Sequence, residues 1–183
     1  MGPGFVGVTQ LRRNVSDTEL LALADAGVRA VRFNLRRGGS AVLERLEGLA
    51  RRVDELVGWH VEVYVDVRHL PELESPLAAV PRLSIDHLGL HSDGLPALLR
   101  LVERGARVKA TGFGRVDLDV AAFLRAITAV NPGALLFGTD WPSTRAPRPV
   151  APTDLDLLFD ASAPTTPRPP STTTPHAWYR IDP

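Results

Sequence analysis

Acidic and imidazole side chains directly follow apolar runs that are typical of buried β-strands. Asp140 comes after "LLFGT", where a carboxylate at a strand end could act as a general base on water. The alternative is an ordinary turn aspartate before Trp-Pro. His87 follows "LSID", where a neutral imidazole could bind a metal ion, polarise a carbonyl group, or be a hydrogen-bonded core histidine. Asp86 could orient His87 or cap the next segment, so the residues alone leave these alternatives open.

Basic and hydroxyl side chains occupy similar positions after other apolar runs. Arg32 in "VRFN" and Arg115 in "GFGR" could each hold a substrate carboxylate by two hydrogen bonds, or could form ion pairs with aspartates. Asn34 shares a strand face with Arg32, and we place both among the candidate substrate-binding residues. Tyr64 could donate to a substrate oxygen or be an interior tyrosine with a satisfied hydroxyl. The aspartates available for such ion pairs are Asp66, Asp86 and Asp140.

The remaining lysine and histidines carry weaker signals. Lys109 is the only lysine, and a buried lysine could form a Schiff base or be carbamylated, but we favour a structural or substrate-contacting role. His91 lies four residues after His87, but Gly89 interrupts any helix between them, which argues against a metal-binding pair. The histidines without a partner pattern are interpreted as structural: His60, His69 and His176.

Strand-like and helix-like segments alternate along the chain, which predicts β-α units and a parallel sheet. The predicted strands are 5–8, 28–33, 60–65, 83–86, 106–109 and 134–139, and the predicted helices are 17–26, 41–57, 95–104, 117–130 and 153–160. The first helix carries a capping box formed by Ser16 and Glu19. An open doubly wound sheet and a (β/α) barrel both fit this order of elements.

The alternation of side chains within the strands favours the barrel. In "HVEVYVD" the three valines share one face, and the polar residues share the other. A sheet covered by helices on both sides should be apolar on both faces. A barrel instead places valines under its helices and polar groups toward its interior and mouth, so the pattern predicts a polar functional mouth.

Length, charge and composition limit the class of protein. The 183 residues predict one domain, and a formal net charge of zero argues against a nucleic-acid or membrane-surface protein. Cysteine is absent from the sequence, so neither disulfides nor thiolate metal sites are expected. There is neither a long apolar run nor a signal-peptide pattern, and we expect a cytoplasmic protein.

The C-terminal part changes in composition. Residues 160–175 contain five prolines and five threonines without periodicity, which predicts a disordered or extended segment. The final "HAWYRIDP" is aromatic again and is expected to dock on the body of the protein. The predicted divisions are therefore 1–160 for the β/α domain, 161–175 for the Pro/Thr segment, and 176–183 for the aromatic tail.

Four motifs resemble those of the amidohydrolase-related family, in the same order: "GVRAVRFNL", "LSIDHLG", "VKATGFGR" and "LLFGTDWP". The resemblance covers roughly residues 5–160 and is greatest to the branch that contains 2-pyrone-4,6-dicarboxylate lactonases. It implies a (β/α)8 TIM-barrel fold with its site at the C-terminal ends of the strands. It further implies a hydrolase that adds water to a small carboxylated lactone or similar ring ester. In that reading Asp140 activates water, His87 and an arginine polarise the carbonyl, and arginines bind the anionic substrate.

The sequence also departs from the family pattern. It lacks the family's His-x-His pair, and it contains six predicted strands rather than eight. We therefore expect an incomplete barrel whose first one or two β-α units are missing. Because two expected ligands are absent, His87 and Asp140 alone would hold a divalent metal such as zinc only weakly. A family helix before the C-terminal motif is also replaced, which suggests a local reading-frame slip across 161–174.

Other functions remain open beside the lactonase. A metal-dependent decarboxylase of the same broad family is one alternative. An inactive or merely ligand-binding incomplete barrel is another. The expected partner is a small anionic substrate, and the two open edges of a six-stranded sheet could support a homo-oligomer.

Overall fold

The computed structural model describes residues 4–36, 40–162 and 175–180, in which strands and helices alternate. The strands are β1 (Gly7–Thr9), β2 (Val28–Asn34), β3 (His60–Tyr64), β4 (Leu83–Ile85), β5 (Arg107–Ala110) and β6 (Leu135–Phe137). The α-helices are α1 (Asp17–Asp25), α2 (Ser40–Val57), α3 (Leu70–Ala78), α4 (Leu95–Glu103), α5 (Val120–Val130), α6 (Pro152–Ser162) and α7 (Pro175–Tyr179). Two short 3₁₀ helices are η1 (Val67–His69) and η2 (His87–Gly89).

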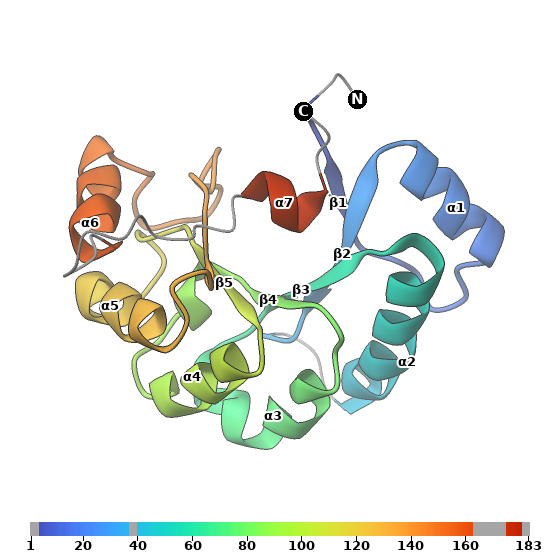
Figure 1. Cartoon of the computed structure of the whole chain (residues 1–183), viewed down its shortest axis with the longest axis horizontal. Coiled ribbons are helices and arrows are strands. Elements are labelled where there is room, and N and C mark those ends of the chain that lie inside the picture. Colours follow the sequence, from blue (N-terminus) through green and yellow to red (C-terminus); the bar gives the residue numbers. More distant parts are fainter. Residues whose placement is uncertain (1–3, 37–39, 163–174, 181–183) are drawn as a thin grey trace.

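The six strands form one parallel sheet in the order β1-β2-β3-β4-β5-β6. The sheet is curved, and the helices that follow the strands lie along its convex side (Figure 1). Within the described residues β1 and β6 each pair with one neighbour only, so the sheet forms part of a barrel without closing. This confirms an incomplete TIM-barrel type of α/β fold with about six β-α units.

The alternation predicted for the third strand is present in the structure. Val61 and Val63 are fully buried in the apolar core, while Glu62 and Tyr64 line cavities on the concave side. Hydrophobic burial under the helices therefore fixes which face of β3 points into the barrel. That register carries the polar side chains to the interior and mouth.

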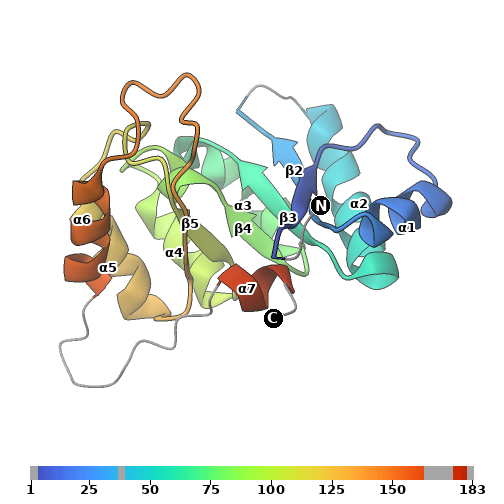
Figure 2. The same cartoon turned by 90° about the horizontal axis from the view of Figure 1, so that it is seen from above.

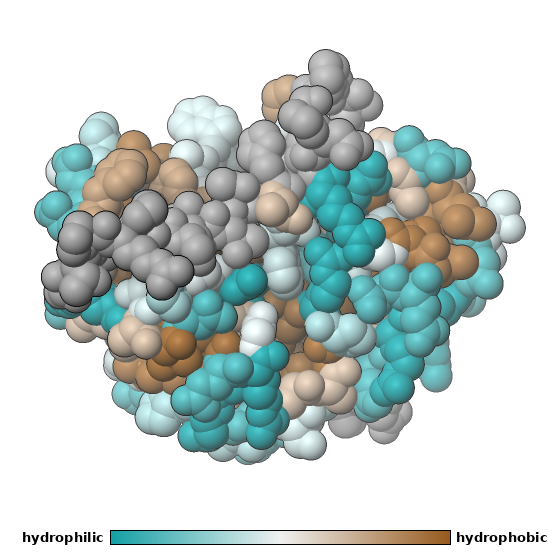
Figure 3. All heavy atoms as spheres, in the orientation of Figure 1, coloured by the Kyte–Doolittle hydropathy of each residue, from teal (hydrophilic) through white to brown (hydrophobic). Residues whose placement is uncertain are grey.

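The predicted helices are present, with small differences in their ends. The capping box of Ser16 and Glu19 begins α1 as predicted. Helix α5 begins at Val120 rather than 117, because the Asp119 carboxylate caps it by accepting from the amide of Ala122. The outward side of α2 is hydrophilic, and teal residues cover its surface in Figure 3.

Helix α3 is an element that the sequence did not predict. Its sequence "LPELESPLA" contains two prolines, which usually argue against a helix. The first proline lies in the first turn, where no backbone donor is needed. Burial of Leu70, Leu73 and Leu77 then stabilises the helix despite Pro76 in its interior.

The C-terminal helix α7 lies on the concave side of the sheet, away from the outer helices (Figures 1 and 2). Its Trp178 is buried, and Arg82 Nη2, just before β4, donates to the Trp178 carbonyl at 2.9 Å. Helix α6 extends to Ser162, two residues beyond the predicted end of the β/α domain. The predicted extended segment 160–175 is helical at both ends, because α6 includes residues 160–162 and α7 begins at Pro175. The rest of that segment, 163–174, with most of the predicted reading-frame slip, lies outside the described residues. None of the described helices combines the length and apolarity that crossing a membrane would require.

Candidate active site

All six predicted site residues line one cavity of about 860 Å³ at the C-terminal ends of the strands. Arg32 and Asn34 lie on β2, and Tyr64 ends β3. His87 begins η2 and is separated from the end of β4 by one residue. Arg115 and Asp140 lie in the loops after β5 and β6. The set is Arg32, Asn34, Tyr64, His87, Arg115 and Asp140. Parallel strands bring their C-terminal ends to one edge of the sheet, which is why residues more than 100 positions apart meet here.

Asp140 lies between an imidazole and a guanidinium group. Its Oδ2 accepts a hydrogen bond from Arg115 Nε at 2.5 Å, and its Oδ1 lies 3.9 Å from His87 Nε2. The second distance is too long for a hydrogen bond. Among the described contacts the Asp140 side chain pairs with Arg115 and does not cap the following turn. The arrangement leaves one carboxylate oxygen directed at His87.

His87 is held on several sides. Its Nδ1 lies 2.8 Å from the Thr111 hydroxyl, and its ring meets the Tyr64 ring edge to face at 5.6 Å. Gly112 passes close by: a Cβ there would lie 2.7 Å from His87 Nδ1. Burial lowers the pKa of His87, which outweighs the opposing influence of Asp86 and Asp140. The imidazole is therefore neutral at pH 7.

The backbone at both candidate catalytic residues is in the left-handed region. His87 has a φ of 50° and Asp140 a φ of 60°, and Leu88 and Leu90 also have positive φ. Non-glycine residues adopt this region at a cost, and they do so most often where a function requires it. The strained backbone at two loops that meet across the cavity supports a functional role for this site.

Both predicted arginines form ion pairs in this structure. Arg32 Nη2 lies 2.6 Å from Asp86 Oδ2, and Arg115 pairs with Asp140. Arg115 Nη2 also donates to the Thr144 carbonyl at 3.0 Å. The ion-pair alternative is thus realised in both cases, and direct binding of a substrate carboxylate by these two groups stays a prediction.

Arg36 is a cavity residue that the sequence did not single out. Its Nη1 donates to the Tyr64 hydroxyl at 3.0 Å, and its guanidinium group lies 5.9 Å from the centre of the Tyr64 ring. Arg145 lines the same cavity from the loop after Asp140. Arg36 follows the β2 strand in "NLRRGG", so a basic residue after a strand end was the available signal.

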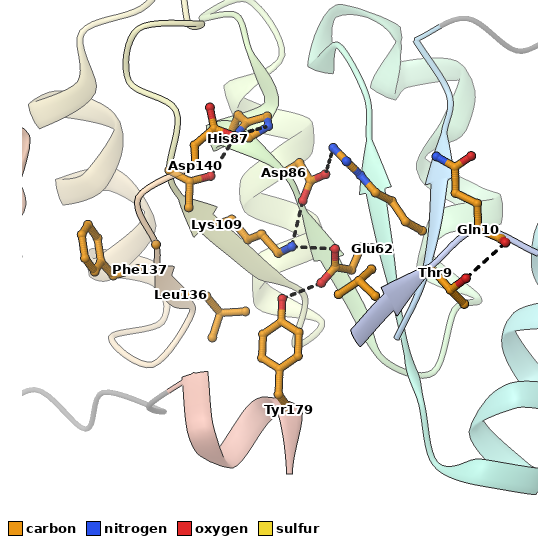
Figure 4. Close-up of a pocket in the computed structure, with 14 residues that line it drawn as sticks. Thr9, Gln10, Glu62, Asp86, His87, Lys109, Leu136, Phe137, Asp140 and Tyr179 are labelled. Atoms are coloured by element: carbon orange, nitrogen blue, oxygen red, sulfur yellow. Dashed lines mark hydrogen bonds and ion pairs between the residues drawn. The ribbon is translucent and has the colours of Figure 1, made fainter. Parts of the chain in front are cut away.

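A second cavity of about 410 Å³ lies deeper inside the barrel and shares Gln10, Arg32, His87 and Asp140 with the first. Charged and hydroxyl side chains outside the six predicted site residues line it (Figure 4). They include Glu62, Asp86, Lys109 and Tyr179. Lys109 Nζ lies 2.6 Å from Glu62 and 3.1 Å from Asp86, so the only lysine has a structural partner on each side.

The donor set does not fit a metal ion. No three His, Cys, Asp or Glu side chains within the described ranges converge in a way that could hold one. Asp86, which precedes His87 in the sequence, is already paired with Lys109 and Arg32. The Arg115 guanidinium also lies against Asp140, which disfavours a second cation there.

Two buried histidines predict how stability depends on pH. Burial lowers the pKa of both His60 and His87 below the ordinary value of 6.5. A lowered pKa means that the unfolded chain binds the proton more readily. The free energy of unfolding is therefore highest above pH 6.5, and it falls as pH decreases toward the pKa values of the two histidines in the folded state. Between pH 7.5 and 5.5 each histidine should remove at most about 1.4 kcal/mol of the free energy of unfolding.

Urea unfolding at these two pH values measures the effect. His87→Gln should reduce the loss between pH 7.5 and 5.5 by the share of one histidine. Glu62 does not contribute to this change, because its pKa is lowered to about 2 and it stays ionised between pH 5.5 and 7.5. A free energy of unfolding that is equal at both pH values would contradict the prediction.

The curated relatives that this chain matches are named as enzymes that act on lactones. The chain is 32% identical over 162 residues to a 2-pyrone-4,6-dicarboxylate hydrolase of Comamonas testosteroni, covering 74% of this chain and 53% of that protein. It is 30% identical over 176 residues to a 4-sulfomuconolactone hydrolase of Rhizobium radiobacter, covering 84% and 58%. It is 29% identical over 160 residues to a D-galactarolactone isomerase of Agrobacterium fabrum, covering 78% and 53%. The chain thus spans little more than half the length of these relatives.

The fold and the family are supported by two further comparisons. A crystal structure of an Agrobacterium tumefaciens protein, determined without ligand, superposes with a TM-score of 0.71 at 23% identity. The match covers 96% of this chain and 66% of that one, and it shows the fold. A family model described as amidohydrolase matches residues 1–174. With the four motifs at the strand ends and the cavity that they line, this match shows that the chain belongs to the amidohydrolase family.

Proposed function

We propose that the chain hydrolyses a small carboxylated lactone or similar ring ester. The observation that carries the proposal is the approach of Asp140 to His87 in a cavity lined by arginines. The names of three curated relatives, two lactone hydrolases and a lactone isomerase, support the choice of a lactone.

In the proposed reaction a water molecule adds to the lactone carbonyl carbon. Asp140 accepts a proton from this water as its oxygen forms the new bond. The Thr111 hydroxyl can donate a hydrogen bond to His87 Nδ1, so the neutral imidazole carries its proton on Nε2. That N–H then donates a hydrogen bond to the carbonyl oxygen as negative charge develops there. When the tetrahedral intermediate collapses, the bond from the carbonyl carbon to the ring oxygen breaks. The proton held by Asp140 passes to that ring oxygen, and the open-chain acid is released.

The charges of the larger cavity favour an anionic substrate. Arg32, Arg36, Arg115 and Arg145 line it, whereas Asp140 is its only lining carboxylate among the described residues. Two of the arginines are occupied by Asp86 and Asp140. No ion pair is found for Arg36 or Arg145 in the part of the chain that the structure describes. These two cations are therefore placed to bind substrate carboxylates by charge-assisted hydrogen bonds.

The test is the turnover of matched lactones by the purified chain. A pyrone ring with two carboxylates, the same ring with one, and the dimethyl ester of the diacid differ in charge while sharing the bond to be cleaved. We expect kcat/KM to fall in that order, and the product to be the open-chain acid by mass spectrometry. Turnover of the dimethyl ester as fast as the diacid would contradict anionic selection. Absence of turnover with all three would contradict the proposed function.

Gly112→Ala is expected to lower kcat/KM by about tenfold or more through His87. The new Cβ would lie 2.7 Å from His87 Nδ1, so the ring must move, and small displacements of a catalytic group are costly. Gly112 also has a φ of +62°, which disfavours alanine by about 1–2 kcal/mol. Steady-state kinetics on the diacid lactone and a thermal melt measure both effects.

Gly105→Ala provides the matched control for this variant. Gly105 has a φ of +100°, but a Cβ added there would meet nothing within 4 Å, and the residue lies before β5, outside both cavities. It should lower the melting temperature to a similar extent and leave kcat/KM unchanged. Equal kinetic losses in the two variants would refute a role for the close contact between Gly112 and His87.

An assembly through the open sheet edges is a further part of the proposal. The β1 edge is unpaired on one side in the described residues, and Val8 there is 41% exposed. Unpaired strand edges readily accept another strand. Light scattering at several protein concentrations tests this, and a monomer at all of them would count against it.

A further inference from the structure

Four charged side chains form a continuous network across the interior of the barrel, called the interior charge network below (Figure 4). Glu62 Oε2 lies 2.6 Å from Lys109 Nζ, which lies 3.1 Å from Asp86 Oδ1. Asp86 Oδ2 in turn lies 2.6 Å from Arg32 Nη2. The members come from four adjacent parts of the sheet: β3, β5, the end of β4, and β2. Positive and negative groups alternate, so each buried charge has an opposite neighbour.

Tyr179 of α7 contacts the interior charge network at Glu62. Its hydroxyl donates to Glu62 Oε1 at 2.5 Å, and the same oxygen lies 3.3 Å from His60 Nε2. The Tyr179 ring also meets the His60 ring edge to face at 4.7 Å and lies 5.9 Å from Lys109 Nζ. A residue 117 positions away in the sequence thus reaches the same carboxylate as the only lysine.

Glu62 and Lys109 both stay charged at neutral pH. Burial opposes ionisation of Glu62, but the donors His60, Lys109 and Tyr179 outweigh it and lower the pKa of Glu62 to about 2. Burial likewise disfavours the Lys109 ammonium, yet Asp86 and Glu62 outweigh it and raise the pKa of Lys109 above its ordinary value. Buried ions that lack such partners are strongly unfavourable, so the position of each member depends on the next.

The other end of the interior charge network, at Arg32, lies in the candidate active site. Asp86 directly precedes His87, and Arg32 lines the cavity that contains Asp140. Asp86 is buried, and among the described residues its carboxylate pairs with Lys109 and Arg32. A shift of the Lys109 ammonium toward Glu62 or away from it would therefore change the restraint on the strand end that carries His87.

We propose that Tyr179 is a positioning residue for the candidate active site, acting through Glu62 and Lys109 on Asp86 and Arg32. Its hydroxyl holds one oxygen of Glu62, which leaves the other directed at Lys109. Lys109 Nζ then lies within ion-pair distance of both Glu62 and Asp86. The C-terminal helix in this way contributes to the geometry of a site that it does not itself line at the mouth.

The role differs from the mere docking of α7. Trp178 already docks the helix, because its indole ring lies under Arg82 at 5.1 Å and Arg107 at 5.4 Å, and its carbonyl accepts from Arg82. Tyr179→Phe removes only the hydroxyl and keeps the ring against His60. Trp178→Phe weakens the docking contacts and keeps the hydroxyl. The two variants therefore separate positioning from packing.

The experiment uses the single lysine as a reporter. In protein labelled with ¹³C and ¹⁵N lysine, Lys109 gives the only side-chain ammonium signal. We expect Tyr179→Phe to shift this signal and to speed exchange of its protons with water. Trp178→Phe should lower the melting temperature and leave the signal in place. An unchanged Lys109 signal in Tyr179→Phe would overturn the proposal.

The functional arm rests on the proposed lactone hydrolysis. Tyr179→Phe should lower kcat/KM for the diacid lactone by about tenfold to a hundredfold, mostly in kcat, while the melting temperature stays near that of the wild type. A shifted Lys109 signal with unchanged kinetics would also overturn the proposal. If the wild type hydrolyses no lactone, the proposed function fails alone. The affinity for benzene-1,3-dicarboxylate by calorimetry then replaces kcat/KM, and an equal affinity in the wild type and Tyr179→Phe would overturn the positioning role.

Discussion

Asp140→Asn is expected to lower kcat for lactone hydrolysis by about 10²–10⁴-fold, the usual contribution of a general base. Asparagine retains the shape of the side chain and one oxygen, but it cannot accept the proton of the attacking water. KM should change little, because the cationic groups that bind carboxylates remain. The ion pair of Asp140 with Arg115 is largely buried, with 16% of each side chain exposed, so its loss should also lower the free energy of unfolding. Stopped-time product assays and a thermal melt measure the two effects.

Asp93→Asn is the matched control. Asp93 Oδ2 lies 3.5 Å from His91 Nδ1, so it too is an aspartate beside a histidine after β4, but it lies outside both cavities. Its replacement should leave kcat and KM unchanged. If Asp140→Asn retained more than about a tenth of the wild-type kcat, Asp140 would not be the general base.

Lys109→Met is expected to lower the free energy of unfolding by about 3–5 kcal/mol, the usual cost of removing one partner of a buried ion pair. Methionine fills much of the same volume, so the loss comes from charge. Glu62 and Asp86 are both nearly inaccessible to solvent, and both would lose their shared cation. Urea unfolding at pH 7.5, followed by circular dichroism, measures the change in the free energy of unfolding.

Two further variants separate charge from packing in this result. The double variant Glu62→Gln with Lys109→Met removes one of the unpaired carboxylates and should recover part of the stability. Arg100→Met breaks a surface pair, in which Arg100 contacts Glu74 at 2.6 Å, and should cost less than about 1 kcal/mol. A cost for Lys109→Met as small as that for Arg100→Met would show that the interior charges are well solvated.

Residues at strand ends could be predicted from the sequence because one simple rule places them. A short apolar run marks a buried parallel strand, and the polar residue that follows it must lie at the C-terminal edge of the sheet. This rule is enough to bring Asp140, His87 and Arg115 together without knowledge of any contact. The alternation in β3 likewise identified which side of the strand faces the interior. Six β-α units and a barrel rather than a flat sheet followed from the same patterns.

The pairing of charges could not be predicted in this way. Arg32 had several aspartates within reach, and only the three-dimensional register shows that it meets Asp86. The contact of Tyr179 with Glu62 depends on where a distant helix docks, which no local pattern encodes. Helix α3 was missed because tertiary burial of its leucines outweighs the local preference of its prolines. Long-range choices of this kind are decided by packing.

The sequential order of the strands has a consequence for how the molecule opens and closes. Each β-α unit contacts mainly its neighbours along the chain, so the body behaves like a short linear array that can fray from either edge. Helix α7 is the exception, since it returns from the C-terminal end to β3 and the start of β5 in the middle of the array. That return forms a contact of high sequence separation, which is slow to form during folding. In native-state hydrogen exchange the central strands should consequently form the last unit to open, with β1 and β6 exchanging earlier.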